Sequence, residues 1–148
     1  MSQHASSAVR RLGAAAALGL LLAGVGLPAV AAPNSVPLNV GQEVTGSNTG
    51  ASGSFTYTID GDQLCYTLVA RNLSVPAVAA HIHQGPRHVA TPPLIPLEFG
   101  ATTSFSVSDC LTFDAAVLAD VEANPRDYYV NVHTPTFPGG EIRGQLTH

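Results

Sequence analysis

The strongest constraint on the fold is a run of alternating side chains that ends in a tight-turn signal. Phe55, Tyr57 and Ile59 alternate with serine and threonine, and such alternation places the apolar side chains on one face of a β-strand. Asp60-Gly61 comes next, and a second apolar-rich run follows it. An Asp-Gly pair between two such runs predicts a β-hairpin. We therefore expect a chain built from antiparallel strands.

Similar short runs, separated by turn residues, continue to the end of the chain. Strands are predicted near residues 38–45, 54–59, 64–69, 78–84, 93–98, 102–108, 127–134 and 141–147. One helix is also predicted, because Asp114 can cap the apolar run 115–122 and Asn124-Pro125 can end it. Seven to eight short strands with one short helix predict an all-β fold, an immunoglobulin-like or Greek-key β-sandwich. A small barrel is the alternative closure.

The first 31 residues have the layout of a secretory signal peptide. Arg10 and Arg11 precede an apolar run over 12–27, and small residues lead to a cleavage site after Ala31. The arginine pair leaves both general secretion and a twin-arginine route open. A retained N-terminal anchor is the alternative to cleavage, although the run is shorter than the ~20 apolar residues of a membrane span. We therefore expect an exported protein with no stable membrane span in its mature chain.

After the signal peptide, the sequence predicts a short tail over 32–37 and one domain over 38–148. The whole chain has a formal net charge of −4, and two of its six basic residues lie in the signal peptide. An acidic domain without basic clusters argues against binding to nucleic acid or to anionic membranes. It does not oppose binding of cations.

The two cysteines, Cys65 and Cys110, are expected to form a disulfide, because export places the pair in an oxidising compartment. The competing interpretation is that one of them is a soft copper ligand. Such sites keep cysteine and histidine close together on one loop. Neither cysteine here has a histidine shortly after it.

Three histidines lie in predicted strands and are the best candidates for a functional site. His81 and His83 are two residues apart, so a strand directs both to one face. His133 lies on another predicted strand, and neighbouring strands would bring three imidazole nitrogens together. That arrangement favours one copper or zinc ion. Buried, hydrogen-bonded structural histidines are the equal alternative, and nitrogens more than ~6 Å apart would contradict the metal hypothesis.

Other polar residues near these strands are candidate supporting residues. Asn131 shares a face with His133 and either orients an imidazole or satisfies a sheet edge. Glu141 and Arg143 are also two residues apart, so they either pair with each other or Arg143 reaches another carboxylate. Arg143 is also a candidate for attracting an anion beside the histidines. His88, in the loop over 84–93, is a candidate fourth ligand or a solvated side chain.

Two segments of the chain resemble the signatures of the CHRD domain family. The motif Ala80-His81-Ile82-His83-Gln84-Gly85 is similar to its AHIHxG signature. The stretch from Tyr128 to Leu146, YYVNVHT followed by FPGGEIRGQL, is similar to its C-terminal signature. The resemblance covers about residues 36–148, and it implies an immunoglobulin-like sandwich without a settled activity. The proline-rich segment 85–93 differs from the Gly-rich turn that is common in the family.

A second, weaker similarity is to copper–zinc superoxide dismutases, which also carry a His-x-His pair on a strand. Only His81, His83 and His133 correspond, and the zinc-binding loop has no counterpart here. The similarity therefore does not imply dismutase activity. We also find no nucleophile motif and no phosphate-binding loop.

The sequence thus predicts an exported CHRD-type binding or interaction module without evident catalytic residues, whose partner is an unknown protein or a metal ion. The alternative is a small copper-binding or zinc-binding protein that uses the three histidines. A metal-dependent redox enzyme is a further option.

Overall fold

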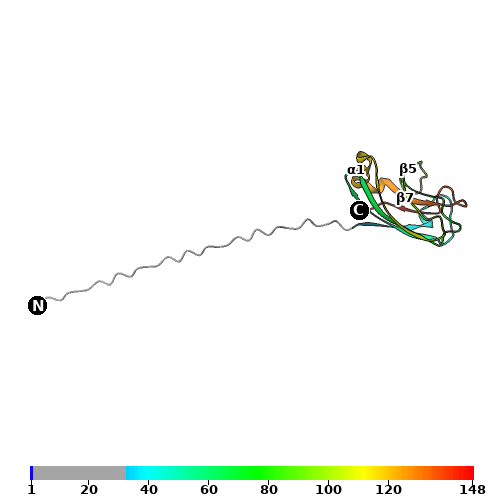
Figure 1. Cartoon of the computed structure of the whole chain (residues 1–148), viewed down its shortest axis with the longest axis horizontal. Helices are drawn as coiled ribbons and strands as arrows, with labels where there is room; N and C mark the ends of the chain where they lie inside the picture. Colours follow the sequence, from blue (N-terminus) through cyan, green and yellow to red (C-terminus); the bar gives the residue numbers. More distant parts are fainter. Residues whose placement is uncertain (2–32) are drawn as a thin grey trace. The chain divides into compact units, whose positions relative to one another are not determined.

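The structure, a computed structural model, describes Met1 and residues 33–148, and the following account concerns residues 33–148. These residues form eight strands and one α-helix (Figure 1). The strands are β1 (Asn34–Asn39), β2 (Ser52–Asp60), β3 (Gln63–Arg71), β4 (Ala79–Gln84), β5 (Pro93–Pro96), β6 (Phe105–Thr112), β7 (Tyr128–His133) and β8 (Ile142–Gln145). The helix α1 covers Ala115–Ala123, and short 3-10 turns cover Val40–Gln42 and Pro125–Asp127.

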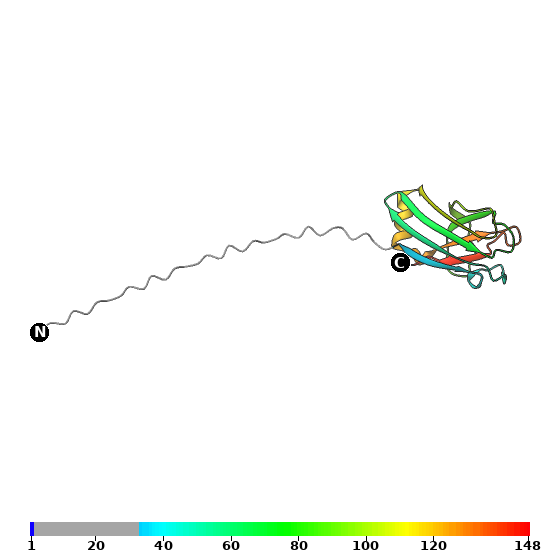
Figure 2. The ribbon, with the colours of Figure 1, turned by 60° about the horizontal axis from the view of Figure 1, so that its bottom comes forward.

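The strands form one antiparallel sheet in the order β5-β4-β7-β8-β1-β2-β3-β6. The β1–β8 junction has a single register pair, Asn39 with Arg143, whereas β2 and β3 are paired along their whole length. The sheet curls on itself, so that two groups of strands enclose the apolar core, and α1 lies at one end of the strands (Figure 2). The all-β, sandwich-like fold is therefore confirmed. β5 and β6 are the two sheet edges, so the sheet is not the closed barrel considered as the alternative.

The predicted hairpin and helix are both present. β2 and β3 are joined by Gly61-Asp62, and Gly61 adopts a φ of 62°, a left-handed conformation that glycine tolerates well. Asp114 caps α1, because its Oδ1 accepts hydrogen bonds from the backbone amides of Ala116 and Val117.

Two strands differ in position from the prediction. Residues 34–37, expected in a tail, form most of β1, and the predicted strand 38–45 gives way to a 3-10 turn after Asn39. The reason is local, since Val36 and Leu38 alternate with outward-facing neighbours and are both 1% exposed. β6 begins at Phe105, three residues later than predicted, and runs to Thr112.

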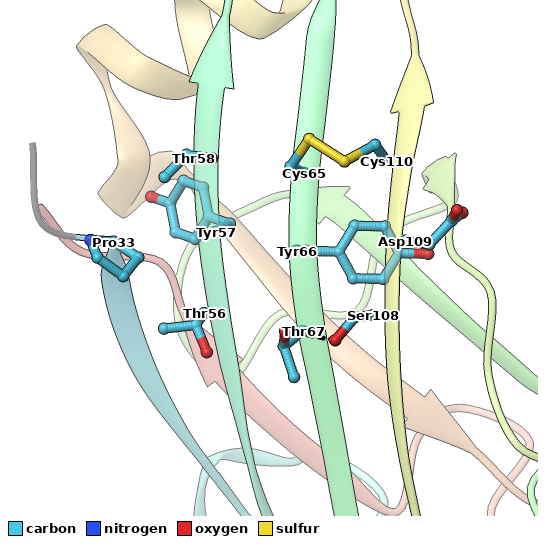
Figure 3. Close-up of a pocket in the computed structure, with 10 residues that line it drawn as sticks. All are labelled: Pro33, Thr56, Tyr57, Thr58, Cys65, Tyr66, Thr67, Ser108, Asp109 and Cys110. Carbon is cyan, nitrogen blue, oxygen red and sulfur yellow. Dashed lines mark hydrogen bonds between the residues drawn. A yellow bond between two sulfur atoms is a disulfide. The ribbon is translucent and has the colours of Figure 1, made fainter. Parts of the chain in front are cut away.

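Cys65 on β3 and Cys110 on β6 form the predicted disulfide. The bond lies on the outer face of the sheet beside Thr58, Thr67 and Ser108, which line the same shallow hollow (Figure 3). With both sulfur atoms in the disulfide, the copper-ligand interpretation of a cysteine is wrong.

The predicted signal peptide lies outside the described residues. Among residues 33–148, no helix has the length and apolar character needed to span a membrane.

Candidate metal centre

The strand register places the three candidate histidines on one face of two neighbouring strands. On β4, His81 and His83 point to the same side because they are two residues apart. β7 pairs with β4 so that His81 lies opposite Asn131, His83 opposite Tyr129 and Ala79 opposite His133. The opposite face of the same strands carries apolar side chains that fill the core, among them Ile82, Val130 and Val132.

The three imidazoles converge. One nitrogen of each lies within 4.8 Å of a nitrogen of the other two. His81 Nδ1 and His133 Nε2 are 3.1 Å apart, and the His83 ring centroid is 5.6 Å from each of the other two. These nitrogen separations satisfy the ~6 Å limit set by the metal hypothesis.

Backbone carbonyls fix the orientation of two of the rings. His83 Nδ1 donates a hydrogen bond to the Thr91 carbonyl at 2.8 Å, and His133 Nδ1 donates to the Pro138 carbonyl at 2.9 Å. Each ring then carries its proton on Nδ1 and presents the Nε2 lone pair to the cluster. His133 Nε2 accepts from His81 Nδ1, whereas His83 Nε2 is buried without a partner.

Burial keeps the imidazoles neutral. It lowers the pKa of His81, and it lowers the pKa of His83, to which His81 and Arg143 also contribute. Burial lowers the pKa of His133 to about 4, against the opposing effect of its hydrogen bond to Pro138. At neutral pH all three residues therefore offer uncharged nitrogen, the form that binds metal ions.

Tyr129 packs against the face of the His83 ring and in turn contacts Arg143. Its ring stacks on Tyr129 with the centroids 4.7 Å apart and the planes inclined by 8°. The guanidinium carbon of Arg143 lies 3.2 Å from the centroid of the Tyr129 ring. The Tyr129 hydroxyl also accepts from the backbone amide of Thr91, the residue whose carbonyl binds His83. Tyr129 and Thr91 therefore support the site, and sequence reasoning missed both.

Arg143 is 1% exposed and binds backbone rather than a carboxylate. It donates to the Pro86 carbonyl at 2.7 Å and to the Val89 carbonyl at 2.9 Å. Gln145 adds a hydrogen bond to the Gly85 carbonyl. These contacts hold the loop 85–92, so the proline-rich segment that departs from the family pattern lies against the histidine strands.

Glu141 and Arg143 do not pair with each other, although their spacing allowed it. Glu141 is fully buried and accepts hydrogen bonds from Thr49, Ser74 and Thr134. Burial alone would raise the pKa of Glu141, but these hydrogen bonds outweigh it and lower the pKa. Glu141 therefore joins three loops as an ionised carboxylate, and it is not a member of the three-histidine group.

Asn131 does not orient an imidazole, and His88 matches the second of the two alternatives considered for it, a solvated side chain. Asn131 donates to the Gly139 carbonyl at 3.1 Å and lies 3.5 Å from a Glu43 oxygen, so its amide hydrogen bonds do not go to an imidazole. His88 is exposed and is not part of the three-histidine group. Glu43 is 8% exposed beside Asn131. Sequence reasoning had no signal for Glu43, because it lies in a loop more than 80 residues before its partner.

These observations define a class: an antiparallel, sandwich-like domain with a buried polar face that carries three converging histidines. The family model that matches is the CHRD domain, over residues 35–146. Since this match covers most of the chain, the protein belongs to the CHRD domain family, as its two sequence motifs indicated. Comparison with curated proteins and with solved structures gave no match.

Proposed function

We propose that the domain is a binding module whose ligand is a metal ion, held by His81, His83 and His133. The observation that carries the proposal is His83 Nε2, a buried nitrogen without a hydrogen-bond partner that faces two other imidazoles. An unpaired buried polar atom is costly in a purely structural network. A metal ion would satisfy that atom together with the other two nitrogens.

The geometry needs little change to coordinate an ion. Bonds of about 2.0 to 2.1 Å from each nitrogen require ligand atoms about 3.4 Å apart in a tetrahedral site. The 3.1 Å contact between His81 Nδ1 and His133 Nε2 is already near this value, and the other nitrogen separations in the group are no longer than 4.8 Å. To bind the ion through Nδ1, His81 would carry its proton on Nε2 instead. The hydrogen bonds to Thr91 and Pro138 are the outer contacts that commonly orient metal-binding imidazoles.

Copper is the favoured ion and zinc is the alternative. Imidazole suits both metals, and divalent copper generally binds a nitrogen site more tightly than divalent zinc does. Three protein ligands leave a further coordination position open, which would also permit redox chemistry at copper. We propose a binding role first, and a metal-dependent redox enzyme only as its extension.

The location proposed for this module is outside the cytoplasm. The Cys65–Cys110 disulfide supports it, because disulfides persist in oxidising compartments. Membership of the CHRD family supports a binding or interaction role, in which a protein partner is compatible with a bound ion.

Titration of the metal-free protein with Cu²⁺ and Zn²⁺ tests the proposal. We expect one ion per chain, and His83→Ala should lower the affinity by about 100-fold or more, since it removes one of three ligands. His88→Ala is the matched control, because it removes an exposed imidazole next to the site. Electron paramagnetic resonance of the Cu²⁺ form should show nitrogen coupling. Equal affinity of wild type and His83→Ala would sink the assignment.

A further inference from the structure

A second polar cluster lies beside the histidines on the same buried face. Asn131 on β7 is paired in register with His81 of β4 on one side and with Arg143 of β8 on the other. Neighbouring strands are about 4.8 Å apart, so this row continues from the metal-binding face to the guanidinium within two strand spacings. Glu43, in the loop after β1, accepts a hydrogen bond from the Asn131 amide at 3.5 Å.

This second cluster contains three buried polar atoms without partners: Glu43 Oε2, Asn131 Oδ1 and Arg143 Nε. Glu43 is 8% exposed, and the other two residues are 1% exposed. The backbone leaves no room for another side chain there. Gly140 adopts a φ of 125°, and a Cβ atom on it would collide with Asn131 and Glu43. Glu43 is therefore held against Asn131 by the surrounding chain.

The histidine site lacks a negative charge of its own. Its three ligands are neutral imidazoles, and the buried guanidinium of Arg143, which lies over Tyr129, forms no ion pair in the described chain. A cation added to such a site would be a second uncompensated positive charge in a buried environment, which is strongly unfavourable. A carboxylate that ionises when the ion binds would offset this cost.

We propose that Glu43 is the charge-compensating residue of the metal centre, and that binding of the ion expels the carboxyl proton of Glu43 to solvent. This inference rests on the proposed metal-binding function. In the metal-free protein the neutral carboxyl avoids a buried negative charge. In the metal-bound protein the Glu43 carboxylate balances one positive charge, so each chain in which Glu43 is protonated loses one proton as one ion enters.

The environment of Glu43 brings the pH at which its carboxyl group ionises close to neutral. Burial raises the pKa of Glu43 to about 7, against the opposing effects of Arg143, the Asn131 amide and the Val44 backbone amide. Arg143 is the charged group that faces it, from β8, while β7 contributes the neutral Asn131. Burial lowers the pKa values of the three histidines, which favours their neutral forms, and any proton they release is common to wild type and Glu43→Gln.

Proton release on metal binding tests the proposal. Zn²⁺ is added to metal-free protein in weak buffer, and the released protons are measured by an indicator dye at pH 7 and at pH 8.5. At pH 7 wild type should release up to about half a proton per ion more than Glu43→Gln, because half of the Glu43 carboxyls are protonated there. The difference between the two proteins removes protons that come from metal-bound water. Glu122→Gln, an exposed carboxyl on α1, should behave as wild type.

The affinity gives a second readout. At pH 8.5, where the wild-type Glu43 is ionised, Glu43→Gln should bind Zn²⁺ about tenfold more weakly, a loss equivalent to ~1.4 kcal/mol. If Glu43→Gln does not fold, Glu43→Ala replaces it in both measurements, because it also removes the carboxyl and keeps the comparison with wild type that cancels protons from metal-bound water. If both proteins bind metal and release the same number of protons, the role proposed for Glu43 is wrong, while the proposed metal-binding function stands. Absence of metal uptake by wild type would overturn the proposed function as well.

Discussion

The β2–β3–β6 side of the sheet and the β4–β7–β8 side differ in what covers their second face. On β3 and β6, burial alternates along the strand, and the outer face keeps hydroxyl groups such as Thr67 and Ser108 in contact with solvent. On β7, all six residues are buried, although the strand carries Asn131 and His133. The first side is an ordinary one-sided antiparallel sheet, and the second has loops over its polar face.

The two sides also differ in how many buried polar atoms lack a hydrogen-bond partner, which is unfavourable for folding. An outer hydroxyl pair in contact with water needs no special partner, and Thr67 and Ser108 simply hydrogen-bond each other at 2.8 Å. Buried imidazole, amide and guanidinium groups must each find partners, and four of the five unpaired buried side-chain atoms in the described chain belong to Glu43, His83, Asn131 and Arg143. Unpaired atoms concentrated on one face support the proposal that the ligand binds there, and the β4–β7–β8 side is called the functional side below.

The largest effect should come from the ordinary side. Replacing Cys65 and Cys110 together by serine should lower the free energy of unfolding by roughly 4 kcal/mol, from the chain entropy of a 45-residue separation. The backbone hydrogen bonds between β3 and β6 do not depend on the disulfide, and the histidines lie on β4 and β7. The folded variant should therefore keep its metal affinity. Urea unfolding and Zn²⁺ titration of the same variant check both statements. A loss of metal binding in the folded variant would show that the two sides are coupled.

The sequence was sufficient to predict the β2–β3–β6 side, because the patterns that specify its elements lie within a few neighbouring residues. Alternation of Phe55, Tyr57 and Ile59 predicted β2, and the residues that follow predicted the turn to β3. The N-cap of α1 was equally local, since Asp114 binds amides two and three residues ahead. The pairing of the two cysteines followed from their number and the expected compartment.

The functional side was predicted only as far as strand periodicity reaches. Periodicity placed His81 and His83 on one face, and the resemblance to CHRD domains put His133 in the same fold. The partners of Arg143 are the carbonyls of Pro86 and Val89, more than 50 residues away, in a loop whose conformation no periodic pattern fixes. Glu43 was missed for the same reason, and β1 was misplaced because Pro37 obscured its alternation.

The next effect should come from the loops that cover the functional side. Glu141→Gln should lower the free energy of unfolding by about 3 kcal/mol, because an amide nitrogen would then face hydroxyl and amide donors that now bind a carboxylate oxygen. Glu98→Gln, an exposed carboxyl near the opposite side, is the control and should change stability little. Chemical denaturation measures both. Equal stability of the two variants would mean that Glu141 does not hold the loops together.

The smallest effect concerns the protonation of His133 in the metal-free protein. Its folded pKa of about 4 lies below the unfolded value near 6.5, so protonation favours the unfolded chain. The stability of wild type relative to His133→Gln should therefore be constant above pH 6.5 and fall as the pH drops toward 4. We expect a relative loss of about 1 kcal/mol by pH 5.5.

The comparison with His133→Gln is necessary because Glu43 acts in the opposite direction. Burial raises the pKa of Glu43 to about 7, so its contribution to stability is present at low pH and lost as the pH rises through 7. Both proteins contain Glu43, and the difference between their urea unfolding curves at pH 7.5, 6.5 and 5.5 leaves the contribution of the histidine. A pH-independent difference would place His133 in contact with solvent, and the polar face would then be as open to water as the outer face of β3 and β6.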